Sequence, residues 1–116
     1  MKVKFDWLRF DDEAADVKTT RFANPYDFSR QMRSLKYDLQ QALYTYVASL
    51  VGIHIRRFLF VTVEYASADY CQLFKIKDIR LARAFEEMHQ ANDEFEECKR
   101  TGKWLSRYSG SVIELD

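Results

Sequence analysis

Hydrophobic and polar residues alternate over residues 2–10 of the chain. The apolar positions are Val3, Phe5 and Trp7. A period of two is typical of a strand with one buried face. A polar turn over residues 11–13 and a second strand-like segment over residues 14–20 follow. The first twenty residues therefore predict a β-hairpin.

A long apolar stripe with helical spacing comes next. Asn24 and Pro25 suit the N-cap and the first position of a helix, and Gly52 suits the residue after its end. The pattern predicts one helix over residues 25–50, whose length leaves room for a bend near residues 34–36. The stripe consists of Phe28, Met32, Leu35, Leu39, Leu43, Val47 and Leu50.

The second half of the chain predicts two more strands and one helix. Residues 55–65 are β-branched and aromatic, and apolar on both parities in their middle, which fits a central strand covered on both faces. Residues 66–69 turn the chain and residues 70–77 form a fourth strand. Asp78 can cap a last helix that ends at Gly102. Its apolar positions are Leu81, Phe85, Met88 and Phe95. The order β-β-α-β-β-α predicts an α/β sandwich built on about four strands.

Composition limits the classes of function. The chain has 116 residues, which fits one domain over residues 1–116, and 47% apolar residues, enough for a packed core. Its 18 Lys and Arg balance 18 Asp and Glu. A polycation that binds nucleic acid by bulk charge is therefore excluded. A small basic excess lies in residues 1–60, the direction expected for DNA contact in that half.

The chain carries no visible targeting or membrane segment. Residues 1–10 lack the apolar core of a signal peptide, and the longest apolar run, Phe58–Val61, is far short of the ~20 residues that span a bilayer. Cys71 and Cys98 have no second Cys or His at ligand spacing, so we expect two buried, unpaired thiols. These features predict a soluble cytoplasmic protein with no membrane partner.

The first hairpin brings charged residues together if its turn centres on Asp11. Cross-strand partners then have numbers that sum to 22, so Asp6 faces Asp16, and Lys4 faces Lys18. Adjacent carboxylates repel unless a cation lies between them, and Mg²⁺ favours one or two carboxylates with waters and phosphate oxygens. Lys18 can orient or help deprotonate a metal-bound water, or neutralise the phosphate. The alternative is a solvent-facing strand whose charges pair across the hairpin.

The segment DVKTT at residues 16–20, followed by RFANP, resembles the D-L-K-T-T segment of PD-(D/E)XK nucleases, most closely those of the exonuclease VIII (RecE) type. The Pro-Asp pair of that family matches Phe5-Asp6 here. YDLQQALY at residues 37–44 resembles the family's Q-h-x-x-Y helix motif and maps Gln40 and Tyr44 onto it. RRFLFVTVE and the closing TGKW follow in the same order. The resemblance covers nearly the whole chain.

This resemblance implies a restriction-endonuclease-like core, an α/β/α sandwich with a small mixed sheet, in a metal-dependent DNA exonuclease. It implies that Asp6 and Asp16 bind Mg²⁺ or Mn²⁺ and that Lys18 assists the attacking water. Gln40 and Tyr44 become catalytic candidates. Double-stranded DNA ends are the expected substrate, in a prophage or recombination setting, with a recombination partner protein or a homo-oligomer as further expectations.

Polar side chains flank the apolar helix stripe and add candidate DNA contacts. Arg33, Tyr37, Gln40 and Tyr44 follow one another at helical spacing, which suits a surface beside a phosphate backbone. The alternative is an ordinary polar helix flank. Further candidate phosphate contacts are Arg21, Arg56 and Arg57, with solvated surface arginines as the alternative.

One departure from the family supports a second hypothesis. Exonucleases of this type carry a segment before the first Asp motif that supplies a further metal-site residue, commonly His or Glu, and here only five residues precede Asp6. We expect His54 and His89, which follow the motifs, to be structural or exposed. The alternative is thus a non-catalytic nuclease-fold protein that acts by binding, such as a truncated prophage remnant or an inhibitor of a nucleic-acid-processing complex. Retention of the motif residues favours the enzyme.

Overall fold

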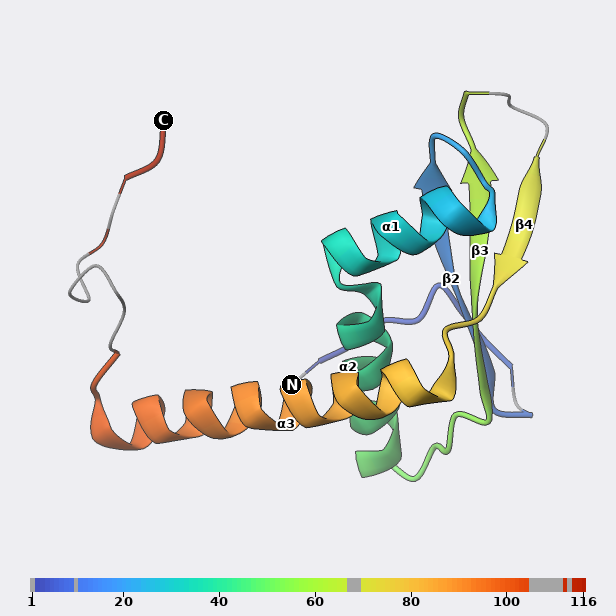
Figure 1. The fold of residues 1–116 in the computed structure, drawn as a ribbon. Coiled ribbons are helices and arrows are strands. Elements are labelled where there is room, and N and C mark those ends of the chain that lie inside the picture. Colours follow the sequence, from blue (N-terminus) through green and yellow to red (C-terminus); the bar gives the residue numbers. More distant parts are fainter. Residues whose placement is uncertain (1, 10, 67–69, 105–111, 113) are drawn as a thin grey trace.

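The computed structural model describes residues 2–9, 11–66, 70–104, 112 and 114–116. The elements, in chain order, are β1 (Trp7–Leu8), β2 (Glu13–Thr20), α1 (Pro25–Leu35), α2 (Tyr37–Leu50), β3 (Arg57–Glu64), β4 (Cys71–Phe74) and α3 (Asp78–Thr101) (Figure 1). This is the predicted order, with the first helix divided into two. The predicted turn at residues 66–69 falls mostly outside the described residues.

The four strands form one mixed sheet in the order β1-β2-β3-β4, as predicted. Only the central pair, β2 and β3, is parallel. Trp7 pairs with Ala15 and Leu8 with Ala14, which is the register expected for a turn centred on Asp11. β1 has two residues where nine were expected. One reason is that the backbone N–H of Val17 donates to the side chain of Asp6, at 2.8 Å, in place of a ladder bond.

The predicted long helix divides at Lys36, within residues 34–36, where its length left room for a bend. This residue takes a left-handed conformation (φ 59°, ψ 44°) that caps α1 through its backbone N–H and starts α2. The break turns the helix and interrupts the predicted apolar stripe, so that Leu35 and Leu50 are exposed. Tyr37, Ala42 and Ala48 are buried in their place.

The core lies on one face of the sheet. Side chains at even-numbered positions of β2 and β3 point to this face, where they meet Phe28 and Met32 of α1 and Tyr37 of α2. The strand side chains in this core are Ala14, Phe58 and Phe60. Phe28 stacks on Phe74 of β4 with ring centroids 4.8 Å apart. The alternation of buried and half-buried residues in β3 shows that this strand is fully covered on one face only, contrary to prediction.

All three helices lie on the same side of the sheet in Figure 1. On the other face, Val17 and Leu73 are exposed. The α/β class and the mixed four-stranded sheet are therefore as predicted. The second helical layer of an α/β/α sandwich is not formed by the residues described.

The helix α3 packs on α2 through Ala84 and Met88, which contact Ala42. Its distal half extends away from the sheet (Figure 1). There Phe95 is exposed and packs against Trp104, at 5.5 Å between centroids, so its predicted core position is wrong.

The ends of α3 match the prediction with one shift. Gly102 (φ 72°) ends the helix as expected, whereas Lys77 is the N-cap and Asp78 lies in the first turn. Cys71 and Cys98 are free thiols as expected, but Cys71 is exposed and Cys98 is half-buried, so the prediction that both are buried is wrong. Each helix in the described part of the chain is too short or too polar to span a bilayer.

Candidate active site

Asp16 and Lys18 lie in the middle of β2 with their side chains on the helix-covered face. Alternate residues of a strand share a face, so the spacing of two places them side by side. Lys18 Nζ lies 2.9 Å from Asp16 Oδ2. Asp16 is 5% exposed. A charged pair thus sits in a surface that is otherwise the apolar core of the protein.

Three contacts hold the ammonium group of Lys18. Besides Asp16, Nζ donates a 2.8 Å hydrogen bond to Gln40 Oε1 of α2 and lies 4.4 Å from the ring centroid of Tyr37. A cation over an aromatic face is attracted by the ring quadrupole. Lys18 is therefore fixed by β2 and α2 together.

Tyr37 is a structural support of this site rather than a free surface residue. It is buried, its ring stacks on Phe60 at 5.8 Å, and its hydroxyl accepts a hydrogen bond from Gln31 Nε2. Gln31 also donates to the carbonyl of Thr19, which ties α1 to β2. The sequence carried no signal for Gln31, because its contact with Tyr37 depends on the break at Lys36.

Asp6 reaches the same site from the edge of the sheet. Its Oδ2 accepts the backbone N–H of Val17, and this bond lowers the pKa of Asp6, helped by a side-chain hydrogen bond from Asp16 and by the charges of Lys18 and Lys4. Burial raises the pKa of Asp16, and the neighbouring Asp6 raises it further, against the lowering effect of Lys18. The two carboxyl groups interact directly, and the proton favours Asp16.

The oxygen atoms of this pair suit a hard cation. Asp16 Oδ2 is buried without a hydrogen-bond partner, because Lys18 Nζ is close to it but outside hydrogen-bond geometry. Among the described residues no group of three or more His, Cys, Asp or Glu side chains gathers as a metal site. Mg²⁺ is commonly held by one or two carboxylates together with water and phosphate oxygens.

Tyr44 lies beside the segment that precedes β1 and carries Asp6. Its ring meets Phe5 edge-on at 5.5 Å, and Phe5 in turn contacts Phe58 at 6.4 Å. Phe5, which stands where the family motif has Pro, thus anchors Asp6 to the core. Gln40, one turn earlier on α2, contacts Lys18 directly, whereas Tyr44 contacts Phe5, the neighbour of Asp6.

The predicted arginine contacts are spread over the molecule. Arg21 is exposed just beyond β2, over the ring of Phe22 at 5.2 Å. Arg33 lies away from Lys18, because the break at Lys36 separates it from α2, and it donates to Ser29 on its own helix. Arg56 and Arg57 pair with the buried Glu13 at the start of β2.

Residues 1–112 match the family model described as a PDDEXK-like domain of unknown function (DUF3799). The chain belongs to this family. No curated protein matches the chain. In this PDDEXK-like domain, the candidate residues Asp6, Asp16 and Lys18 lie together at one place.

Proposed function

We propose that this PDDEXK-like domain is a metal-dependent deoxyribonuclease that hydrolyses phosphodiester bonds. One observation supports the proposal most strongly: the buried carboxyl of Asp16, with an oxygen lacking a hydrogen bond, lies between Lys18 and Asp6. Carboxyl groups whose pKa is shifted by burial and by a specific charge partner are found at many functional sites.

Each side chain then has a distinct role. Asp6 and Asp16 would hold Mg²⁺ or Mn²⁺, which, when bound, acidifies a water molecule and offsets charge on the phosphate. Lys18 is held beside Asp16, within reach of a group bound there, and orients the attacking water or neutralises a phosphate oxygen. Gln40 fixes Lys18, and Tyr44 with Phe5 fixes the segment that carries Asp6.

The finer assignment is an exonuclease that acts on the ends of double-stranded DNA in the cytoplasm. It is supported by the likeness of DVKTT and of the Gln40–Tyr44 motif to nucleases of the exonuclease VIII type. A prophage or recombination setting, with a recombination partner or a homo-oligomer, belongs to the same proposal. Arg21, exposed beyond the end of β2, is the candidate phosphate contact nearest to Lys18 along the chain.

A specific observation favours a second candidate, a nuclease-fold protein that acts by binding. Within the described residues, Asp6 and Asp16 gain no third ligating side chain, and Lys18 is already engaged by Asp16 and Gln40. A site that binds metal only weakly would keep the nuclease fold but lose the hydrolytic activity.

Cleavage of linear and circular DNA tests the proposal. The purified chain, with Mg²⁺ or Mn²⁺, should degrade linear duplex and spare a covalently closed circle of the same sequence. D16N and K18M should lose this activity, whereas D93N and K99M, changed at exposed positions of α3, should keep it. Equal cleavage by all four variants would trace the activity to a contaminant and reject the assignment.

Calorimetry with Mn²⁺ separates the two candidates. The nuclease proposal expects binding heat that D16N abolishes and D93N retains, because a carboxamide is a poorer ligand for a hard cation. No heat at millimolar Mn²⁺, together with intact linear DNA, would favour the binding protein.

A further inference from the structure

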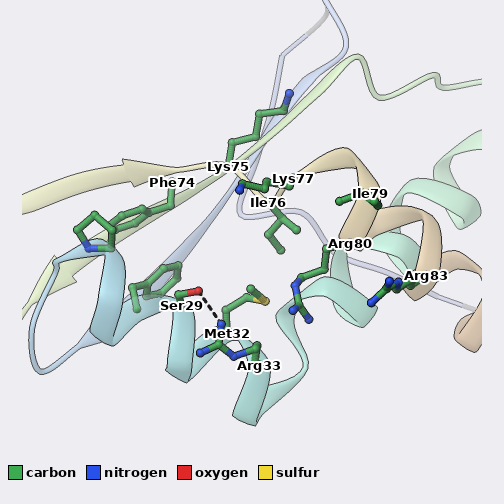
Figure 2. Close-up of a pocket in the computed structure, with 12 residues that line it drawn as sticks. Ser29, Met32, Arg33, Phe74, Lys75, Ile76, Lys77, Ile79, Arg80 and Arg83 are labelled. Atoms are coloured by element: carbon green, nitrogen blue, oxygen red, sulfur yellow. Dashed lines mark hydrogen bonds between the residues drawn. The ribbon is translucent and has the colours of Figure 1, made fainter.

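A groove of about 480 Å³ lies between α1 and the segment that joins β4 to α3. Figure 2 shows the two sides facing each other, with Met32 of α1 and Ile76 of the connecting segment between them. The lining residues are Pro25, Phe28, Ser29, Met32, Arg33, Phe74, Lys75, Ile76, Lys77, Ile79, Arg80 and Arg83. Five of these carry a positive charge, and the set includes no Asp or Glu.

The cations of this groove are only partly neutralised. Arg80 lies 3.7 Å from the buried Asp38, and Lys75, which points away from the groove in Figure 2, lies 3.8 Å from Asp78. In the part of the chain that the structure describes, Arg33, Lys77 and Arg83 form no ion pair. All three are exposed. Like charges gathered at one site repel, so an anion bound there would be stabilised.

The floor of the groove is apolar. Phe28, Met32 and Ile76 are buried, and Phe74 is half-buried and stacked on Phe28. A ligand that matches both parts must combine a flat apolar group with negative charge. A nucleotide unit has this chemistry, because its base can lie on an apolar surface while its phosphate faces cations.

We propose that this groove binds a single strand of nucleic acid, with phosphates at Arg33, Lys77 and Arg83 and a base against the floor. A duplex fits less well, since its bases are stacked inside and cannot reach Met32 and Ile76. Arg33, expected from the sequence to contact DNA, keeps that role here on a different surface.

The groove is separate from the candidate active site. On α1, Gln31 faces Thr19 and Tyr37 of the active site, whereas Arg33 faces the groove. Phe28 of α1 lies between the groove and the candidate active site, since it lines the groove and contacts Tyr37. The inference rests on the proposed function in its choice of nucleic acid as the ligand, but binding in the groove does not require cleavage.

Fluorescence anisotropy with a labelled twelve-nucleotide single strand, in EDTA to prevent cleavage, tests the groove. The variant R33E/K77E/R83E should bind at least tenfold more weakly than the parent chain. The control R30E/K99E/K103E makes the same change in net charge at exposed positions outside the groove and should bind within about threefold of it. The slope of log affinity against log salt should fall by about 2 in the groove variant, since each single-strand phosphate contact contributes ~0.7.

Additional variants and a measurement of the oligomeric state separate the possible outcomes. The variant R33Q/K77Q/R83Q, which only neutralises the cations, should show the same direction of change. D16N should bind the strand like the parent chain, so a lost nuclease activity and a lost groove are told apart. Equal weakening in groove and control variants would overturn the proposal. So would a groove variant that binds the strand normally but sediments as a smaller species, because the occupant would then be a second copy of the chain.

Discussion

Two buried carboxylates on β2 differ in how their charge is balanced. Glu13, at the start of the strand, is 8% exposed, and Asp16, three residues on and on the other face, is 5% exposed. Each oxygen of Glu13 has an arginine partner: Arg57 Nη2 at 2.9 Å on Oε1 and Arg56 Nη2 at 3.5 Å on Oε2. Asp16 has one cation beside it, a second carboxyl opposite, and an oxygen without a hydrogen bond.

This difference distinguishes a structural ion pair, at Glu13, from a candidate functional site, at Asp16. Burying a charge is unfavourable unless the charge is paired and hydrogen-bonded. Glu13 meets that condition with two guanidinium groups whose outer parts stay in water. Asp16 meets it only in part, because one cation is shared with the neighbouring Asp6, and burial raises the pKa of Asp16. Carboxyl groups left in this condition are common where a protein binds a cation or performs chemistry.

The largest expected contrast is in cleavage. E13Q should leave DNA cleavage within about threefold of the parent rate, because Glu13 points to the other face of the sheet. D16N should lower it by about a thousandfold, equivalent to ~4 kcal/mol of transition-state stabilisation. The measurement is the initial rate on end-labelled linear duplex at saturating Mg²⁺. Comparable losses in both variants would show that the two carboxylates do not differ in function.

The next contrast concerns the free energy of unfolding. Here the larger effect is expected at Glu13 and the smaller one at Asp16. Replacing both arginines, in R56A/R57A, leaves Glu13 buried without a cation and should lower the free energy of unfolding by about 2 kcal/mol. D16N should lower it little or raise it, because the substitution removes a buried charge. Urea unfolding followed by circular dichroism measures both. The double variant R30A/R100A, at exposed positions, controls for the loss of two arginines.

A pH series sharpens the same comparison. The folded pKa of Asp16 is raised above its ordinary value of 3.8, so its contribution to stability is fully present below that value and is lost as pH rises through the folded pKa. The advantage of D16N over the parent chain should therefore grow as pH rises from about 4 and then level off. The pKa of Asp6 is lowered, so its contribution to stability changes only below pH 3.8 and does not affect the series above pH 4. An advantage that stays constant with pH would contradict the raised pKa.

The sequence predicted the hairpin register because period-two patterns and a polar turn act locally. Trp7 opposite Ala15 follows directly from the turn at Asp11. The convergence of Asp6, Asp16 and Lys18 follows from that register. The sequence also located the end of α3, where Gly102 adopts the positive φ that glycine tolerates best.

What the sequence did not predict depends on tertiary contacts. The length of the helix left room for a bend near residues 34–36, but no local pattern marks the left-handed conformation of Lys36, which few residues other than glycine adopt. Arg33 therefore left the predicted stripe, while Tyr37 became a buried support for Lys18. The pairing of Arg56 and Arg57 with Glu13 likewise requires the parallel register of β2 and β3, which joins residues far apart in the chain.

The smallest expected effect comes from loosening the ammonium group of Lys18. Gln40 restrains Lys18 through one hydrogen bond of 2.8 Å, and the ring of Tyr37 and Asp16 remain when it is lost. Q40A should therefore lower cleavage about tenfold and stability by less than ~1 kcal/mol, since a single hydrogen bond contributes about that much. Q40E, which keeps an acceptor for Lys18 Nζ, should recover part of the rate. The same two substitutions at Gln90, exposed on α3, should change neither quantity. If Q40A matched D16N in lost activity, Gln40 would itself contact the substrate rather than position Lys18.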